Sequence, residues 1–108
     1  MIFHLAESGH WAAAQESGVY EQSTRGRTLA EEGFIHASSA EQWPVVRARF
    51  YADYPGDLVL LTIDPDLVHA EVRLEVGDIV TEESFPHIHG PLDVDAVVET
   101  RRLEPPHA

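Results

Sequence analysis

The spacing of apolar and polar residues along the chain predicts six β-strands. Residues 57–64 form a continuous apolar run, so both faces of that strand are expected to be covered by other parts of the protein. The other runs are shorter or alternate with period two, and most of them end at glycine, proline or serine. The predicted strands are residues 2–6, 34–37, 57–64, 71–76, 85–89 and 96–103.

The strand over residues 71–76 has the strictest alternation in the chain. Its apolar residues Val72, Leu74 and Val76 are expected to point inward. Glu75 and its charged neighbours are expected to face solvent, which makes this a half-exposed strand.

Two helices are predicted before the third strand. The first covers residues 8–17, with Ser8 as its N-cap. The second begins at one of two overlapping capping boxes, which start at Ser38 and Ser39, and it runs to about Asp53. Its apolar stripe is expected to comprise Trp43, Val46, Phe50 and Tyr54.

The order of these elements predicts a small α+β domain. Helices come early and strands dominate late, which favours a twisted mixed or split β-sheet over a doubly wound parallel one. We expect a single globular domain over residues 1–103 and a disordered tail over residues 104–108. Polar residues at 22–32 and 78–84 predict loops.

Composition and charge exclude several classes of function. The chain has 108 residues, no cysteine, seven arginines without any lysine, and 19 acids, which give a net charge of −12. This charge argues against binding to nucleic acids or anionic membranes. Without cysteine or lysine there is no disulfide, thiolate or Schiff-base chemistry. No apolar span or leader is apparent, so we expect a cytoplasmic protein, and the acidic surface favours a monomer.

Histidines in apolar surroundings are the strongest indication of a site. Burying an imidazole without partners is costly, so each such ring needs a hydrogen bond or a ligand. Two sets of residues share a strand face, Phe34, His36 and Ser38 in one strand and Phe85, His87 and His89 in another. Aromatic rings beside imidazoles suit a ligand with a flat ring and hydroxyl or phosphate groups. His4 occupies a similar position in the first strand.

Other interpretations of these residues stay open. A strand histidine can simply bind a backbone carbonyl, and His4 is one candidate for that structural role. His87 and His89 could form half of a zinc or iron site with a carboxylate, but the spacing is weak evidence and we expect no metal. Arg25 and Arg27 could clamp a phosphate or simply lie in a solvated loop. The histidines expected to be solvated are His10, His69 and His107.

Four strings resemble a known family. The strings are IFHLAESGHW, EEGFIHASSAEQ, DLVLLTIDPDLV and FPHIHGPLDVDAVV, and the resemblance extends from Ile2 to about Leu103. They are similar to the bacterial family called "domain of unknown function 952". The order of G-F-I-H-x-S, L-x-x-I-D-P and F-P-H-x-x-G-P-L makes the resemblance specific.

This resemblance implies a fold similar to the ADP-ribosyltransferases, which bind NAD in a cleft of a split β-sheet. By that likeness, His4 would bind ribose hydroxyls, and His36 and Ser38 would lie beside the nicotinamide. A glutamate usually follows at a third position, where it stabilises positive charge on the ribose. Residues 85–90 contain no glutamate, which argues against ADP-ribosyl transfer to protein.

We therefore expect a protein that binds NAD or a related small nucleotide. If it is an enzyme, the reaction would be cleavage or transfer at the ribose C1′, with His36 and His87 as the catalytic residues. The residues expected to bind the nucleotide are His4, Phe34, Ser38 and His89. The alternatives are a binding module without catalysis and a metal-dependent enzyme that uses His87 and His89.

Overall fold

The computed structural model describes the chain except for Ile79 and the side chain of Asp78. Short 3₁₀ helices cover Pro65–Leu67 and Val94–Ala96. The other elements are, in chain order, β1 (Ile2–Glu7), α1 (Ser8–Ser17), β2 (Val19–Tyr20), β3 (Gln22–Thr24), β4 (Arg27–Thr28), α2 (Leu29–Glu32), β5 (Ile35–His36), α3 (Trp43–Phe50), β6 (Leu58–Ile63), β7 (Val72–Asp78), β8 (Glu83–Ile88), β9 (Leu92–Asp93) and β10 (Val97–Leu103).

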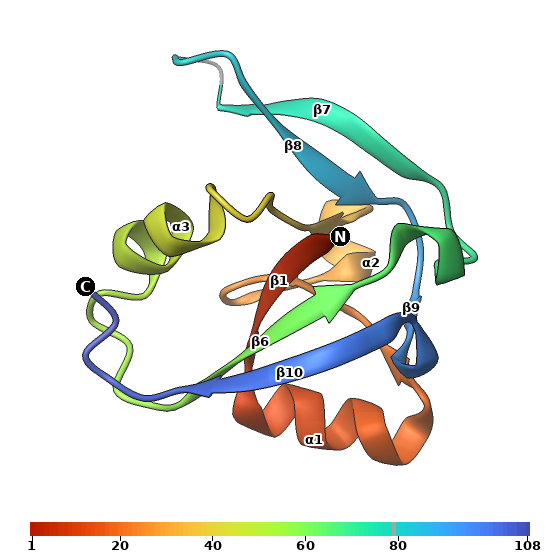
Figure 1. The fold of residues 1–108 in the computed structure, drawn as a ribbon, viewed down its shortest axis with the longest axis horizontal. Coiled ribbons are helices and arrows are strands. Elements are labelled where there is room, and N and C mark those ends of the chain that lie inside the picture. Colours follow the sequence, from red (N-terminus) through yellow and green to blue (C-terminus); the bar gives the residue numbers. More distant parts are fainter. Residues whose placement is uncertain (79) are drawn as a thin grey trace.

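Two three-stranded sheets form the framework of the protein, in the orders β1-β6-β10 and β5-β8-β7 (Figure 1). They meet where Phe3 and Ser38 exchange backbone hydrogen bonds of 2.8 and 2.7 Å. The α+β class and the split into two sheets agree with expectation. The expectation of a mixed sheet is wrong, because every strand pairing among the described residues is antiparallel.

The core lies on both faces of β6, the central strand of the first sheet. On one face, Leu61 packs in a cluster with Trp11 of α1. On the other face, Leu60 packs in a second cluster with Tyr51, which follows α3. A continuous apolar run was expected to be covered on both faces, and the structure confirms this for β6.

The helices differ from expectation at their ends. Helix α1 includes Ser8, and its N-cap is Glu7, which makes no side-chain capping bond. Before α3, Ser39 and Gln42 exchange the two bonds of a capping box, at 2.9 and 3.2 Å. Helix α3 ends at Phe50 rather than near Asp53.

The apolar stripe of α3 is also corrected at one position. Phe50 is 51% exposed, whereas the adjacent Tyr51 is buried in the core. Trp43, Val46 and Tyr54 pack against that core cluster as expected. Because the helix stops at Phe50, the backbone turns there and the next residue takes the inward position.

Residues 22–32 were expected to be a loop, but they form the β3–β4 hairpin and helix α2. A capping box between Thr28 and Glu31 begins the helix. The hairpin turn is fixed to α3 by Arg25, whose Nη1 donates to the Phe50 carbonyl at 2.9 Å and to Asp53 Oδ1 at 2.6 Å. Arg25 is thus paired within the protein, which argues against the alternative that it clamps a phosphate.

Strands β7 and β8 form a hairpin that extends beyond the core (Figure 1). Val72 lies at its base and packs against the core. Further out, Leu74 and Val76 are 74% and 52% exposed, so the expectation that they point into the core is wrong. The hairpin also shortens the loop expected at 78–84, of which residue 79 lies outside the described residues.

The tail at residues 104–108 is attached to the domain through His107, whereas it was expected to be disordered. His107 is only 3% exposed, which also corrects its assignment as a solvated histidine. Arg47 of α3 donates from Nε to His107 Nδ1 at 3.0 Å, and His107 Nε2 donates to the Gly56 carbonyl at 2.8 Å. A neutral imidazole can make both bonds, so this ring joins the tail to α3 and to the segment before β6.

We expect His107→Ala to lower the free energy of unfolding by about 1–2 kcal/mol, because Arg47 and the Gly56 carbonyl would lose their partner. Urea unfolding followed by circular dichroism measures this. The control is His69→Ala, because the exposed His69 ring pairs with Asp93 at the surface. Equal free energies of unfolding for the two variants would contradict the claim that His107 attaches the tail to the domain.

The described residues include no helix long and apolar enough to cross a membrane.

Candidate functional site

A cleft of about 370 Å³ lies among β1, β3, β5, α3 and the β7–β8 hairpin. His36 and Ala37 contribute from β5 and its end, and Ser38 follows at the junction of the two sheets. Helix α3 contributes Arg49 and Phe50. The cleft is therefore built where the two sheets separate and α3 covers the gap between them.

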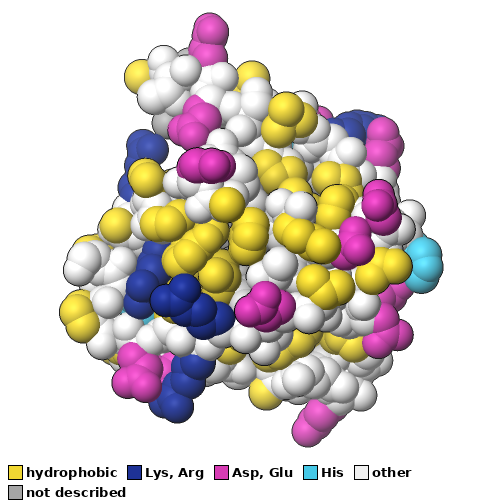
Figure 2. Space-filling view, in the orientation of Figure 1, with side chains coloured by type: hydrophobic (Ala, Val, Ile, Leu, Met, Phe, Trp, Pro, Cys, Tyr) yellow, Lys and Arg dark blue, Asp and Glu magenta, His cyan; other side chains and the backbone are white. Residues whose placement is uncertain are grey.

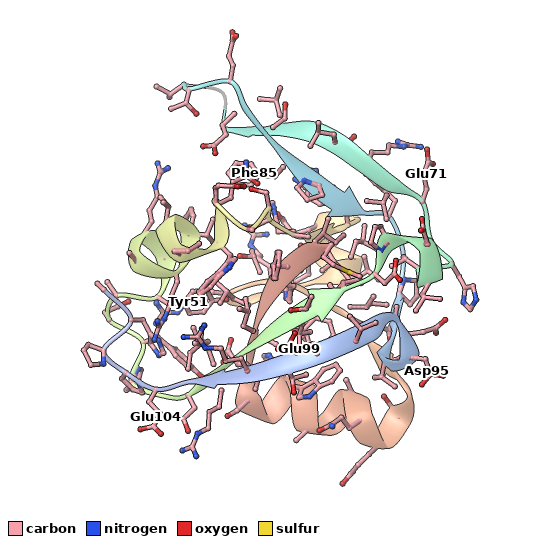
Figure 3. The ribbon with its side chains drawn as sticks, viewed as in Figure 1. Tyr51, Glu71, Phe85, Asp95, Glu99 and Glu104 are labelled. Carbon is pink, nitrogen blue, oxygen red and sulfur yellow. The ribbon has the colours of Figure 1, made fainter. Side chains whose placement is uncertain are left out.

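The lining of the cleft combines aromatic rings with hydrogen-bonding groups. Figure 3 labels two of its aromatic residues, Tyr51 after α3 and Phe85 on β8. Burial raises the pKa of Tyr51 to about 12, so its hydroxyl stays protonated at neutral pH. Thr24 and Ser38 add further hydroxyl groups. Among the described residues of this acidic chain, no aspartate or glutamate lines the cleft.

His4 lies at the base of the cleft with both ring nitrogens bound inside the protein. Its Nδ1 donates to the His36 carbonyl at 2.5 Å, and its Nε2 accepts from the Tyr20 hydroxyl at 2.8 Å. Burial lowers the pKa of His4 to about 4, so the ring is neutral at pH 7. These contacts favour the structural interpretation of His4, which joins β1 to β2 and β5.

His36 is the imidazole that the cleft exposes most, with 36% of its side chain accessible. Its Nε2 lies 3.5 Å from Glu32 Oε1 at the end of α2. Burial lowers the pKa of His36, and the nearby His87 lowers it further. A neutral His36 can therefore donate or accept a hydrogen bond in the cleft at neutral pH.

His87 lies beside the cleft in a separate cluster with Glu75 and His89, and Phe34 packs against this cluster. The Phe34 ring stacks on His87 with centroids 4.1 Å apart and an angle of 17°. Both histidines donate to Glu75 Oε1, from His87 Nδ1 at 2.9 Å and from His89 Nε2 at 2.6 Å. The buried Nε2 of His87 has no partner among the described residues. We call Glu75, His87 and His89 the histidine–carboxylate cluster.

Glu75 was expected to face solvent, and its position in this cluster is a correction. Strand β7 pairs with β8 so that Glu75 lies opposite Phe85, on the face that carries His87 and His89. The two bonds from the histidines lower the pKa of Glu75, so its carboxylate is ionised. Residues 85–90 contain no glutamate, and the carboxylate that binds His87 and His89 comes from the neighbouring strand β7.

The expected site residues therefore divide between two places. His4, His36 and Ser38 line the cleft, whereas Phe34, His87 and His89 lie in or against the cluster. The two places touch through the rings of His36 and His87, whose centroids are 5.1 Å apart.

Sequence reasoning missed several residues that complete the cleft. Thr24 was assigned to a loop, and Arg49 carried no motif, although it follows one turn after Val46 on the helical face that was expected to be buried. That helical spacing was the available signal for Arg49. No sequence signal indicated that Tyr51 would replace Phe50 in the core.

Comparisons with known proteins give a family and a fold. Two solved structures of the protein CC0527 from Caulobacter crescentus are similar to this chain. The crystal structure has a TM-score of 0.80 at 27% identity, covering 95% of this chain and 85% of that one. The solution NMR structure has a TM-score of 0.67 at 26% identity, covering 95% and 84%. Neither description names a function.

No curated protein matches the chain. One family profile matches residues 5–100, which are most of the chain, and its description is "protein of unknown function (DUF952)". The chain belongs to the DUF952 family.

Proposed function

We propose that this protein binds a small nucleotide-like molecule, of the chemical class of NAD and ADP-ribose, in the cleft beside His36. The observation that carries the proposal is the lining. Arg49 and the hydroxyl groups can bind phosphate and ribose, and Phe50 and Phe85 can pack against a flat ring. No carboxylate among the described lining residues would repel an anionic ligand.

The distribution of charge supports the same ligand class. The net charge is −12, yet Figure 2 shows arginine side chains gathered on the side of the molecule where α3 lies, beside an apolar surface. Arg47 and Arg49 both belong to α3. A small anion can approach this basic region, whereas a long polyanion would also meet the acidic remainder of the surface.

The fold supports the ligand class at a coarser level. Two three-stranded sheets that separate around a cleft, with His36 and Ser38 at the separation, resemble the split sheet of ADP-ribosyltransferases. We propose on this basis that the domain is ADP-ribosyltransferase-like. In such a site His36 is the residue of the cleft that could act as a general acid or base.

We expect binding without turnover. Cleavage at a ribose C1′ develops positive charge on the sugar, and a carboxylate is the group that stabilises it. Glu75 belongs to the cluster and does not line the cleft. An assay of nicotinamide release from NAD checks this. If the wild type released nicotinamide and His36→Ala did not, the protein would be an enzyme and the expectation of binding without turnover would be wrong.

The binding test uses Arg49→Gln. We expect the affinity for ADP-ribose, measured by isothermal titration calorimetry, to fall by about tenfold or more, because a charge-assisted hydrogen bond contributes about 1.5–3 kcal/mol. Binding of adenosine, which has no phosphate, should change little. The matched control is Arg102→Gln on β10, where the arginine pairs with Asp57 outside the cleft. Equal losses for both variants, or none for Arg49→Gln, would contradict the proposal.

A further inference from the structure

The histidine–carboxylate cluster provides three metal-ligating groups around one point. Ligand atoms of Glu75, His87 and His89 all lie within 4.8 Å of one another. Both imidazoles are directed at a single oxygen, Glu75 Oε1. Two histidines and one carboxylate are the donor set that zinc and iron(II) bind in proteins, with coordination positions left open for water or a ligand.

The surroundings hold these donors in place. His87 is buried, and its ring is stacked by Phe34 at 4.1 Å. His89 is fixed through its backbone, because its N–H donates to the Glu71 carbonyl at 2.8 Å. Strand pairing between β7 and β8 fixes the third donor, Glu75, on the same face. Little chain entropy would therefore be lost when a metal orders this site.

Two further observations favour a cation over a purely structural hydrogen-bond cluster. The neighbouring Arg73 is paired with Glu71 at 2.7 Å, so its positive charge is compensated. The net charge of −12 attracts a divalent cation further.

We propose that Glu75, His87 and His89 bind one divalent transition-metal ion of the zinc type. The metal replaces the protons that now lie between the imidazoles and the carboxylate, and the two ring nitrogens become ligands together with a carboxylate oxygen. The three residues do not line the cleft, so the metal site can be tested in the absence of any nucleotide.

The test is a titration of the 108-residue chain, produced without a histidine tag and treated with a chelator. Co²⁺ is the first probe, because its visible absorption reports nitrogen and oxygen ligands directly, and Zn²⁺ then displaces it. We expect one ion per chain. His89→Ala should weaken Zn²⁺ binding by at least about tenfold, as the loss of groups around metal sites typically does.

Two variants keep the result interpretable. Glu75→Gln preserves an oxygen that can accept the histidine bonds, so it should fold, but it lacks the charge and should also lose Zn²⁺ affinity. His69→Ala is the matched control, because it removes an exposed imidazole that also contacts a carboxylate, that of Asp93. The proposal would be overturned by an absence of Co²⁺ absorption, or by binding that survives both His89→Ala and Glu75→Gln.

Discussion

Replacing His4 by alanine is expected to lower the free energy of unfolding by about 3 kcal/mol. The change leaves two buried groups without partners, the His36 carbonyl and the Tyr20 hydroxyl, and each costs about 1–3 kcal/mol when unsatisfied. The lost ring also leaves a cavity between β1 and β5. Urea unfolding followed by circular dichroism measures the loss.

The control for this prediction is His10→Ala. His10 lies on α1, and its partly exposed ring is 3.8 Å from Glu7, so its removal should change stability by no more than about 0.5 kcal/mol. If His4→Ala were as stable as this control, the ring would not hold the two sheets together, and a role in ligand binding would become the better interpretation of His4.

The second large effect is a loss of stability in mild acid. The pKa of His4 is about 4 in the folded protein and 6.5 when exposed, so between these values the unfolded chain binds a proton that the folded chain does not. The free energy of unfolding therefore falls as the pH is lowered from 6.5 to 4. The contribution of His4 amounts to about 3 kcal/mol, since one pKa unit corresponds to about 1.4 kcal/mol.

Unfolding curves at pH 7 and pH 4.5 measure this effect in the wild type and in His4→Gln, which cannot titrate. The difference between the two proteins isolates His4 from the other groups that change protonation in this range. We expect the wild type to lose more stability on acidification than the variant. The same loss in both proteins would show that His4 is protonated in the folded state without cost.

Features that are determined by the local sequence pattern could be predicted. Strand β6 was found from a continuous apolar run because a strand covered on both faces needs no polar side. His36 and Ser38 were placed together because alternation along a strand puts them on one face, and both line the cleft. The single-residue error at Phe50 arises because helical spacing cannot show where a helix stops.

The features that depend on partners distant in the sequence could not be predicted. Alternation along β7 correctly placed Glu75 and Leu74 on different faces of the strand. It cannot tell which face meets other side chains once a hairpin extends beyond the core. Glu75 is inward because β8 presents His87 and His89 to it. Similarly, the tail has no periodic pattern, and it is ordered by the contact of His107 with Arg47.

The most direct test of nucleotide binding is an NMR titration of isotope-labelled protein with ADP-ribose, with the backbone and histidine ring signals followed. We predict saturable shifts at His36, Ser38 and Arg49 around the cleft. Signals from β10, on the far edge of the first sheet, should stay in place. An absence of shifts at millimolar ADP-ribose, or shifts located away from the cleft, would contradict the account.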